Sequence, residues 1–238
     1  MIVCLDSGNT RIKWGVHDGE RWLAQGAVAH NDVEQLGQLL GDWPNPDRVM
    51  LANVAGADAG GRIREQLAPW LPVFREARSM PSGCGIVNLY IKPESLGVDR
   101  WCALIGAHGV TASAALVVMA GTATTIDSID GNGHFLGGLI LPGIDLMLRS
   151  LARETAGLPF ARGCHSPLPR STDDAIVSGA IEAQAGAIER AYSRLDDSTA
   201  ICIISGGNAE LIAQYLVIPY RLTDNLPLEG LRRLALEP

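Results

Sequence analysis

The chain of 238 residues is 47% hydrophobic and 19% charged, a composition that excludes a disordered protein. Its 26 Asp and Glu residues outnumber its 19 Lys and Arg residues, which gives a net charge of −7. Because nucleic acids and acidic membrane surfaces are bound through clustered cations, this balance argues against both as partners. The length allows one or two domains.

The cysteines and the N-terminal segment indicate the compartment. Five widely spaced cysteines without a C-x-x-C pair argue against a disulfide framework and against a zinc site. The opening MIVCLDSG lacks the positive start and the apolar length of a signal peptide, and no apolar run reaches membrane-spanning length. We therefore expect a cytoplasmic protein without a membrane partner.

Apolar runs that end at turn residues predict the elements of the first half. Residues 2–5 form a short buried strand that is stopped by Asp-Ser-Gly at 6–8. Residues 11–17 alternate as a second strand, and Asp-Gly at 18–19 is a hairpin signal. Further strands are predicted at 21–28 and 48–52, and helices at 31–41, 58–70 and 95–108.

The same order recurs in the second half, where a buried strand at 115–120 is stopped by Gly121-Thr122. The remaining predictions are strands at 123–129, 134–141 and 200–204, and helices at 143–154, 172–195, 208–216 and 226–236. Gly8 and Gly121 are separated by close to half the chain. The repeat therefore predicts two related α/β halves, residues 1–112 and 113–238, and the alternative is coincidence, since strand-turn-strand patterns are common.

Three Gly-rich turns follow apolar strands, namely DSGNT (6–10), AGTATT (120–125) and SGGN (205–208). Backbone N–H groups at such turns approach an anion closely, and Thr hydroxyls add donors. Each turn alone equally fits a tight hairpin or a helix entry, whereas the three together predict a phosphate cradle. The chain has no P-loop, dinucleotide fingerprint, zinc-protease motif or nucleophile elbow, and its five scattered histidines fit surface or loop positions.

Four charged residues are candidates for chemistry, each with a structural alternative. Asp6 suits a hydrated Mg²⁺ or an Asx turn. Lys13 suits a phosphate contact from the second strand or a surface position. In LGVDRW (96–101), Asp99 is a general base or a helix N-terminal residue, and Arg100 is an anion clamp or its surface partner. Spacing alone does not separate these alternatives.

Six segments in this order resemble type III pantothenate kinases, a family of the actin-like ATPase superfamily, and among them the subgroup named Bvg accessory factors. The segments are DSGNTRIK (6–13), NLYIKPESLGVDRW (88–101), AGTATTID (120–127), GGLILPGIDLM (137–147), STDDAIVSGA (171–180) and ISGGNAELI (204–212). The resemblance spans nearly the whole chain. It implies two duplicated ribonuclease H-like α/β domains, an interdomain cleft that binds ATP, and a homodimer. The implied reaction is ATP-dependent phosphorylation of pantothenate, the first step of coenzyme A synthesis.

The resemblance also implies roles for particular residues. It makes Asp6 a metal ligand, Asp99 the catalytic base and Thr122 an ATP contact. The first phosphate and Mg²⁺ loop would consist of Asp6, Ser7, Gly8, Asn9, Thr10, Arg11, Ile12 and Lys13. The implied pantothenate contacts are Tyr90, Gly97, Val98, Asp99, Arg100 and Thr172. Thr172 also fits the N-cap region of the long helix.

Two positions depart from the family, and two other functions stay open. Met119 stands where the family commonly has an Asp that binds a monovalent cation, K⁺ or NH₄⁺, and a thioether is a poor ligand for K⁺. Leu89 stands where many relatives have Gly.

One alternative function is that of a catalytically degenerate nucleotide-binding regulatory protein of the same fold. The other is an actin-like ATPase without a small-molecule acceptor.

Overall fold

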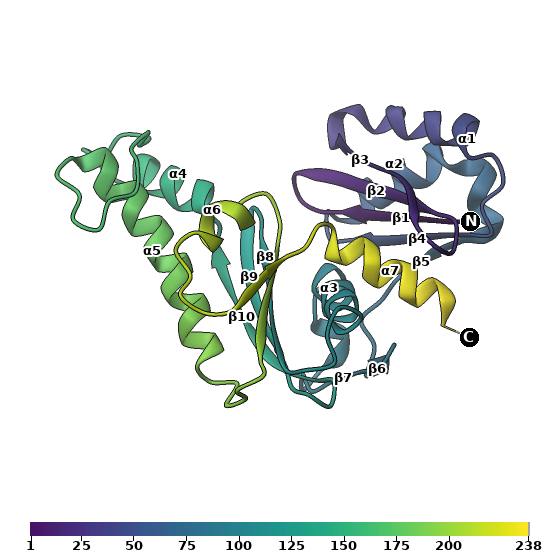
Figure 1. The fold of residues 1–238 in the computed structure, drawn as a ribbon. Coiled ribbons are helices and arrows are strands. Elements are labelled where there is room, and N and C mark those ends of the chain that lie inside the picture. Colours follow the sequence, from purple (N-terminus) through teal and green to yellow (C-terminus); the bar gives the residue numbers. More distant parts are fainter. Residues whose placement is uncertain (238) are drawn as a thin grey trace. The chain divides into compact units, whose positions relative to one another are not determined.

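The computed structural model describes residues 1–237, which form two compact units (Figure 1). The first unit comprises Met1–Val110, Gly133–Phe135 and the segment that begins at Asn225. The second comprises Thr111–Asn132 and Leu136–Asp224. Each unit has its own buried apolar core.

The first unit is built on a five-stranded sheet in the order β3-β2-β1-β4-β5. The strands are β1 (Ile2–Ser7), β2 (Arg11–His17), β3 (Trp22–Ala29), β4 (Arg48–Asn53) and β5 (Phe74–Glu76). The central strand β1 is antiparallel to β2 and parallel to β4, and all six of its residues are buried. The strand predicted at 2–5 therefore continues through Asp6 and Ser7, which places Asp6 opposite Lys13 of β2.

Alternate residues of β1 enter two separate apolar clusters, as side chains of a strand buried on both faces must. Val3 and Leu5 pack with η1 (His30–Gly37), α1 (Gln38–Asp42), α2 (Ala57–Gln66) and η2 (Ala68–Val73). Ile2 and Cys4 pack with α3 (Val98–His108) and α7 (Leu226–Leu236). The remaining short elements of this unit are β6 (Ser82–Gly83), β7 (Ile86–Asn88) and η3 (Pro93–Ser95).

The last helix, α7, packs on the first unit, although the sequence division grouped it with residues 113–238. It lies against α3, β1 and β4 (Figure 1). Leu228, Leu231 and Ala235 bury their side chains in the cluster that contains Cys4. A Cβ at Gly230 would overlap the backbone of Cys102, so only Gly permits this approach of α7 to α3. The first boundary lies at residues 110 and 111, and the two duplicated domains stay a prediction.

The second unit is built on five strands of a seven-stranded sheet, whose order is β12-β11-β8-β9-β10-β7-β6. The five strands are β8 (Ala115–Ala120), β9 (Ala123–Ile129), β10 (His134–Pro142), β11 (Ile201–Ser205) and β12 (Tyr220–Leu222), and the helices are α4 (Ile144–Glu154), α5 (Thr172–Tyr192) and α6 (Ala209–Ala213). Leu116 and Val118 of β8 pack in one cluster with Leu148 of α4 and Ile181 of α5. The two sheets with their helices confirm the predicted mixed α/β class.

The start of α5 confirms the predicted position of the helix N-terminus. Ser171 is the N-cap, and its hydroxyl accepts a hydrogen bond from the Asp174 backbone N–H at 3.1 Å. Thr172 is the first helical residue and lies within the N-cap region, as predicted. Every helix of residues 1–237 is too short or too polar for a membrane span.

Candidate functional site

The first Gly-rich turn joins β1 to β2 and is held by neighbours on three sides. The Gly8 N–H donates to the Arg11 carbonyl at 3.2 Å, and the Val54 N–H donates to the Ser7 carbonyl at 3.0 Å. The Nε2 atom of His30 lies 2.7 Å from the Gly8 carbonyl oxygen. Sequence reasoning missed His30, because nothing around it in the chain marks it. The turn is thus a braced backbone segment, as a phosphate-binding loop requires.

Asp6 is a buried carboxylate near the end of β1, and one of its oxygens has no hydrogen-bond partner among the described residues. This oxygen is Oδ1, and the residue is 9% exposed. Burial and the negative charge of Asp99 raise the pKa of Asp6 to about 7, and Lys13 acts in the opposite direction. A buried carboxylate oxygen without a protein partner fits a group that binds a cation.

The donor set around Asp6 fits Mg²⁺ rather than a protein-enclosed metal. Within residues 1–237, no three His, Cys, Asp or Glu side chains gather closely enough to hold a metal ion. Mg²⁺ keeps several waters and is held through one or two carboxylates together with substrate phosphates. Asp6 alone therefore satisfies what the protein must contribute.

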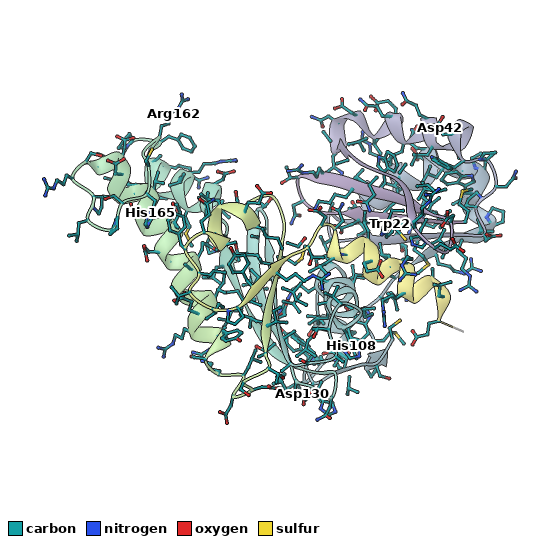
Figure 2. The ribbon with its side chains drawn as sticks, in the orientation of Figure 1. Trp22, Asp42, His108, Asp130, Arg162 and His165 are labelled. Atoms are coloured by element: carbon teal, nitrogen blue, oxygen red, sulfur yellow. The ribbon has the colours of Figure 1, made fainter. Side chains whose placement is uncertain are left out.

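His165 makes structural contacts with two neighbouring segments of the second unit. His165, labelled in Figure 2, lies in the connection between α4 and α5. Its Nε2 is 2.7 Å from Glu182 Oε1, and its ring lies 4.1 Å from the ring of Tyr215. These contacts hold the α4–α5 connection against α5 and satisfy one ring nitrogen of His165.

Asp99 lies in the first turn of α3, and its partly exposed carboxylate is fixed locally. Gly97 is the N-cap, and Asp99 Oδ1 accepts the Arg100 backbone N–H at 2.8 Å. A Cβ at Gly97 would lie 2.7 Å from Asp99 Oδ1, so a larger residue would push the carboxylate away. Asp99 thus occupies a helix N-terminus, and its charge also acts on Asp6.

Arg100 is buried, which contradicts its interpretation as a surface partner of Asp99. Only 5% of it is exposed. Its guanidinium carbon lies 5.7 Å from the ring centroid of Tyr90 and 5.9 Å from that of Phe135. The two rings are 5.1 Å apart. Sequence reasoning missed Phe135, which lies outside all the quoted segments and meets Arg100 only through β10.

The segment that carries Tyr90 is organised by the buried side chain of Asn88. Its amide nitrogen donates to the carbonyls of Met80 and Pro93 at 3.3 and 3.1 Å, and its oxygen accepts the Tyr90 N–H at 3.1 Å. Leu89 is 53% exposed, so its side chain takes no part in this packing. Tyr90 is therefore positioned by its backbone despite the unusual residue before it.

The second and third Gly-rich turns lie together in the second unit, because β8 and β11 are neighbours. The Asn208 N–H donates to the Ala120 carbonyl at 3.0 Å, and Gly143 donates to the Thr122 carbonyl at 2.9 Å. Gly206 has a φ of +112°, and its Cβ would overlap the Ala120 backbone. Thr122 is exposed at this edge of the sheet. Two of the three predicted cradle turns thus form one surface.

Thr172 lies in the second unit at the edge of a largely apolar cavity of about 520 Å³ between α4 and α5. The other lining residues are Met147, Ser150, Leu151, Leu158, Ala175, Ile176, Gly179 and Ala180. Tyr90, Gly97, Val98 and Arg100, which we also expected to contact pantothenate, belong to the first unit.

Solved structures share this fold over nearly the whole chain. A Campylobacter jejuni protein described as a Baf family transcriptional activator superposes with a TM-score of 0.63 at 20% identity, covering 98% of this chain and 96% of its own. The activator of 2-hydroxyisocaproyl-CoA dehydratase from Clostridium difficile, solved with ADPNP, gives a TM-score of 0.56 at 13% identity, covering 99% and 92%. The likeness is one of fold, and it agrees with the α/β fold of the actin-like ATPase superfamily that the sequence resemblance implies.

Sequence comparison identifies the family within this class. The family model of type III pantothenate kinase matches residues 2–194. A type III pantothenate kinase of Dechloromonas aromatica is 68% identical over 237 residues, covering 100% of both chains. One from Aromatoleum aromaticum is 48% identical over 238 residues, covering 100% of this chain and 98% of its own. The chain belongs to the type III pantothenate kinase family, which confirms the predicted kinase class.

Proposed function

We propose that the protein transfers the γ-phosphoryl group of ATP to the primary hydroxyl of pantothenate, giving ADP, 4′-phosphopantothenate and a proton. The observation that carries the proposal is the pair of interacting carboxylates, Asp6 at the end of β1 and Asp99 at the start of α3. Asp6 suits a metal ion beside the phosphates, and Asp99 suits the hydroxyl of the acceptor. Membership of the kinase family supports ATP as the donor.

Binding and orientation of ATP would depend on the braced turns. Phosphoryl transfer passes through a loose transition state, so positioning and charge neutralisation dominate catalysis. N–H groups of residues 7–10 and the amine of Lys13 would contact phosphate oxygens from the first unit, and Thr122 from the second. Mg²⁺ bound at Asp6 would supply neutralisation of phosphate charge.

Asp99 would accept the proton of the pantothenate hydroxyl as the oxygen attacks. The hydrogen bond from the Arg100 N–H holds one carboxylate oxygen and leaves the other for the substrate. Tyr90, Arg100 and the backbone at Gly97 and Val98 would bind the rest of pantothenate, together with Thr172. We also propose a cytoplasmic homodimer, which is supported by five free cysteines and by exposed apolar side chains on β10.

The residues around Met119 do not fit the monovalent cation site expected from the family. Met119 pairs in register with Thr125 of β9 and Ser205 of β11, so the three side chains share one face of the sheet. Both hydroxyls are buried without a hydrogen-bond partner in the described part of the chain. At position 119 itself a thioether replaces the carboxylate that the family commonly has, and the buried carboxylate on this face of the sheet is that of Asp127, two residues from Thr125 on β9. No step of the proposed reaction is therefore assigned to this cation.

Release of ADP by the purified protein tests the proposed function. We expect release from MgATP to depend on pantothenate and to yield one 4′-phosphopantothenate for each ADP. ADP release at the same rate with and without pantothenate would indicate an ATPase. Binding of nucleotide without any ADP release would indicate a regulatory protein. Either result would contradict the proposal. The Asp99→Asn variant is the matched negative control.

The same assay in Na⁺, K⁺ or NH₄⁺ salts tests the interpretation of Met119. We expect nearly equal turnover in the three salts, because the thioether offers no charge to K⁺. Met119→Asp supplies the missing carboxylate and should acquire a preference for K⁺ over Na⁺, together with a K⁺-dependent rise in melting temperature. A strong K⁺ requirement in the unmodified protein would show that the remaining oxygens suffice.

A further inference from the structure

We propose that Phe135 is a positioning residue that holds the Arg100 guanidinium for the carboxylate of pantothenate. The inference rests on the proposed function and deepens it. It adds a residue from outside every sequence motif, and it assigns Arg100 to the acceptor carboxylate and not to a phosphate.

The Phe135 ring is fixed by the backbone that carries it. Phe135 is fully buried and pairs in register with Asn88 through the parallel contact of β10 with β7. Its carbonyl accepts the Leu89 N–H at 3.2 Å, next to Tyr90. The strand pairing therefore sets the ring of Phe135 directly beside the segment that carries Tyr90. The two rings are 5.1 Å apart at 41°, which is a tilted aromatic contact.

Both rings contact a long, buried cation. The Arg100 guanidinium lies within 6 Å of both ring centroids, and such contacts strengthen when the cation is desolvated, as it is here. A free Arg side chain has many rotamers, and ordering it on binding costs free energy. Aromatic contacts that order it beforehand remove that cost. They also fix the plane of the guanidinium, which decides whether its paired N–H groups can meet a carboxylate.

The neighbours of Arg100 favour the acceptor carboxylate over a phosphate. Lys13 on β2 pairs in register with Asp6 on β1, so it lies on the side on which the phosphates are expected. Arg100 instead contacts Tyr90, which is an expected pantothenate contact. A planar carboxylate matches the guanidinium in a bidentate manner, whereas Lys acts as a point charge. The phosphates of ATP and the carboxylate of pantothenate would thus each have a separate cation in the first unit, Lys13 and Arg100.

Phe135→Leu tests the proposal, because it removes the ring and keeps an apolar side chain. We expect KM for pantothenate to rise about tenfold, the effect of roughly 1.4 kcal/mol, while KM for ATP is unchanged. Pantothenol, in which a hydroxymethyl group replaces the carboxylate, serves as a competitor. Its inhibition constant should not change, since it lacks the group that Arg100 recognises.

Two further variants separate positioning from general stability. Phe74→Leu is the matched control, because it makes the same change at a buried position of the same unit, in the apolar cluster that contains Val3 and Leu5. It should leave the KM for pantothenate and the inhibition constant of pantothenol unchanged. Phe135→Tyr retains the ring and should restore KM for pantothenate. If Phe135→Leu does not fold, Phe135→Met replaces it in the same comparison.

The possible results are distinct. Loss of affinity for pantothenate alone supports the proposal. Equal weakening of pantothenate and pantothenol, or an unchanged KM for pantothenate, would overturn it and leave Phe135 as an ordinary core residue. Failure of the proposed function itself appears separately, as absence of pantothenate-dependent ADP release in the unmodified protein.

Discussion

Asp99→Asn is expected to lower kcat about 10²–10⁴-fold, the range seen when a general base is removed. The amide cannot accept the proton of the pantothenate hydroxyl. Its oxygen still accepts the Arg100 N–H, so the local structure of α3 should persist. Steady-state ADP release at saturating ATP and pantothenate measures the effect. Melting temperature and circular dichroism verify that the variant folds.

Asp58→Asn provides a matched control for this variant. Asp58 also lies in the first turn of a helix of the first unit, α2, and its side chain is exposed. Loss of a favourable interaction with the helix dipole should cost both variants at most about 1 kcal/mol of stability. Only Asp99→Asn should lose turnover. Near-normal kcat in Asp99→Asn would refute its assignment as the base.

Asp6→Asn is expected to make the metal-free protein more stable and to abolish most of its kinase activity. The pKa of Asp6 is raised to about 7 in the folded protein from its usual 3.8, mainly by burial. The folded state therefore binds the proton more tightly than the unfolded state does. Each pKa unit corresponds to about 1.4 kcal/mol, so the ionised side chain costs up to about 4 kcal/mol at high pH.

The sign of this effect sets the pH window for the measurement. Because the folded pKa is raised, the destabilisation by Asp6 is absent below about pH 4. It grows as the pH rises through the interval up to about 7, and it is complete above that. In EDTA, Asp6→Asn should therefore melt higher than the unmodified protein at pH 8, and the difference should shrink toward pH 5. Thermal melts at several pH values give this comparison.

Added Mg²⁺ supplies the other half of the test. With a nucleotide present, Mg²⁺ should raise the melting temperature of the unmodified protein at pH 8 and have little effect on Asp6→Asn. Asp42→Asn, at an exposed position at the end of α1 (Figure 2), is the control and should follow the unmodified protein throughout. A metal-free Asp6→Asn that melts lower than the unmodified protein at pH 8 would contradict the picture of an uncompensated buried charge.

Much of the fold follows from local patterns, because long regular elements carry a strong periodic signal. The predicted strands at 11–17, 115–120 and 123–129 and the helix at 226–236 have the observed bounds. Strands β5, β6, β7 and β12 were missed, since two or three residues are too few to show a period. The helix predicted at 31–41 begins as the 3₁₀ segment η1, which apolar spacing does not distinguish from an α-helix.

Some residues of the candidate site were predicted from their neighbours in the sequence, and others are found only through contacts with distant segments. Asp6, Lys13, Asp99 and the three Gly-rich turns were found from the sequence, because each is marked by a strand end, a turn or a helix start within a few residues. His30 and Phe135 carry no such mark. Their contacts, with Gly8 and Arg100, join residues that are 22 and 35 positions apart.

The sequence by itself determined that this acidic chain is an α/β protein with Gly-rich turns at strand ends, because strand length, turn residues and apolar runs are local properties. Only the tertiary structure decided that Arg100 is buried against two rings, that α7 packs on the first unit, and that Asp6 Oδ1 is buried without a hydrogen-bond partner among the described residues. The reason is physical. Burial and electrostatic environment depend on which distant segments meet, and the spacing of residues along a chain does not record those meetings.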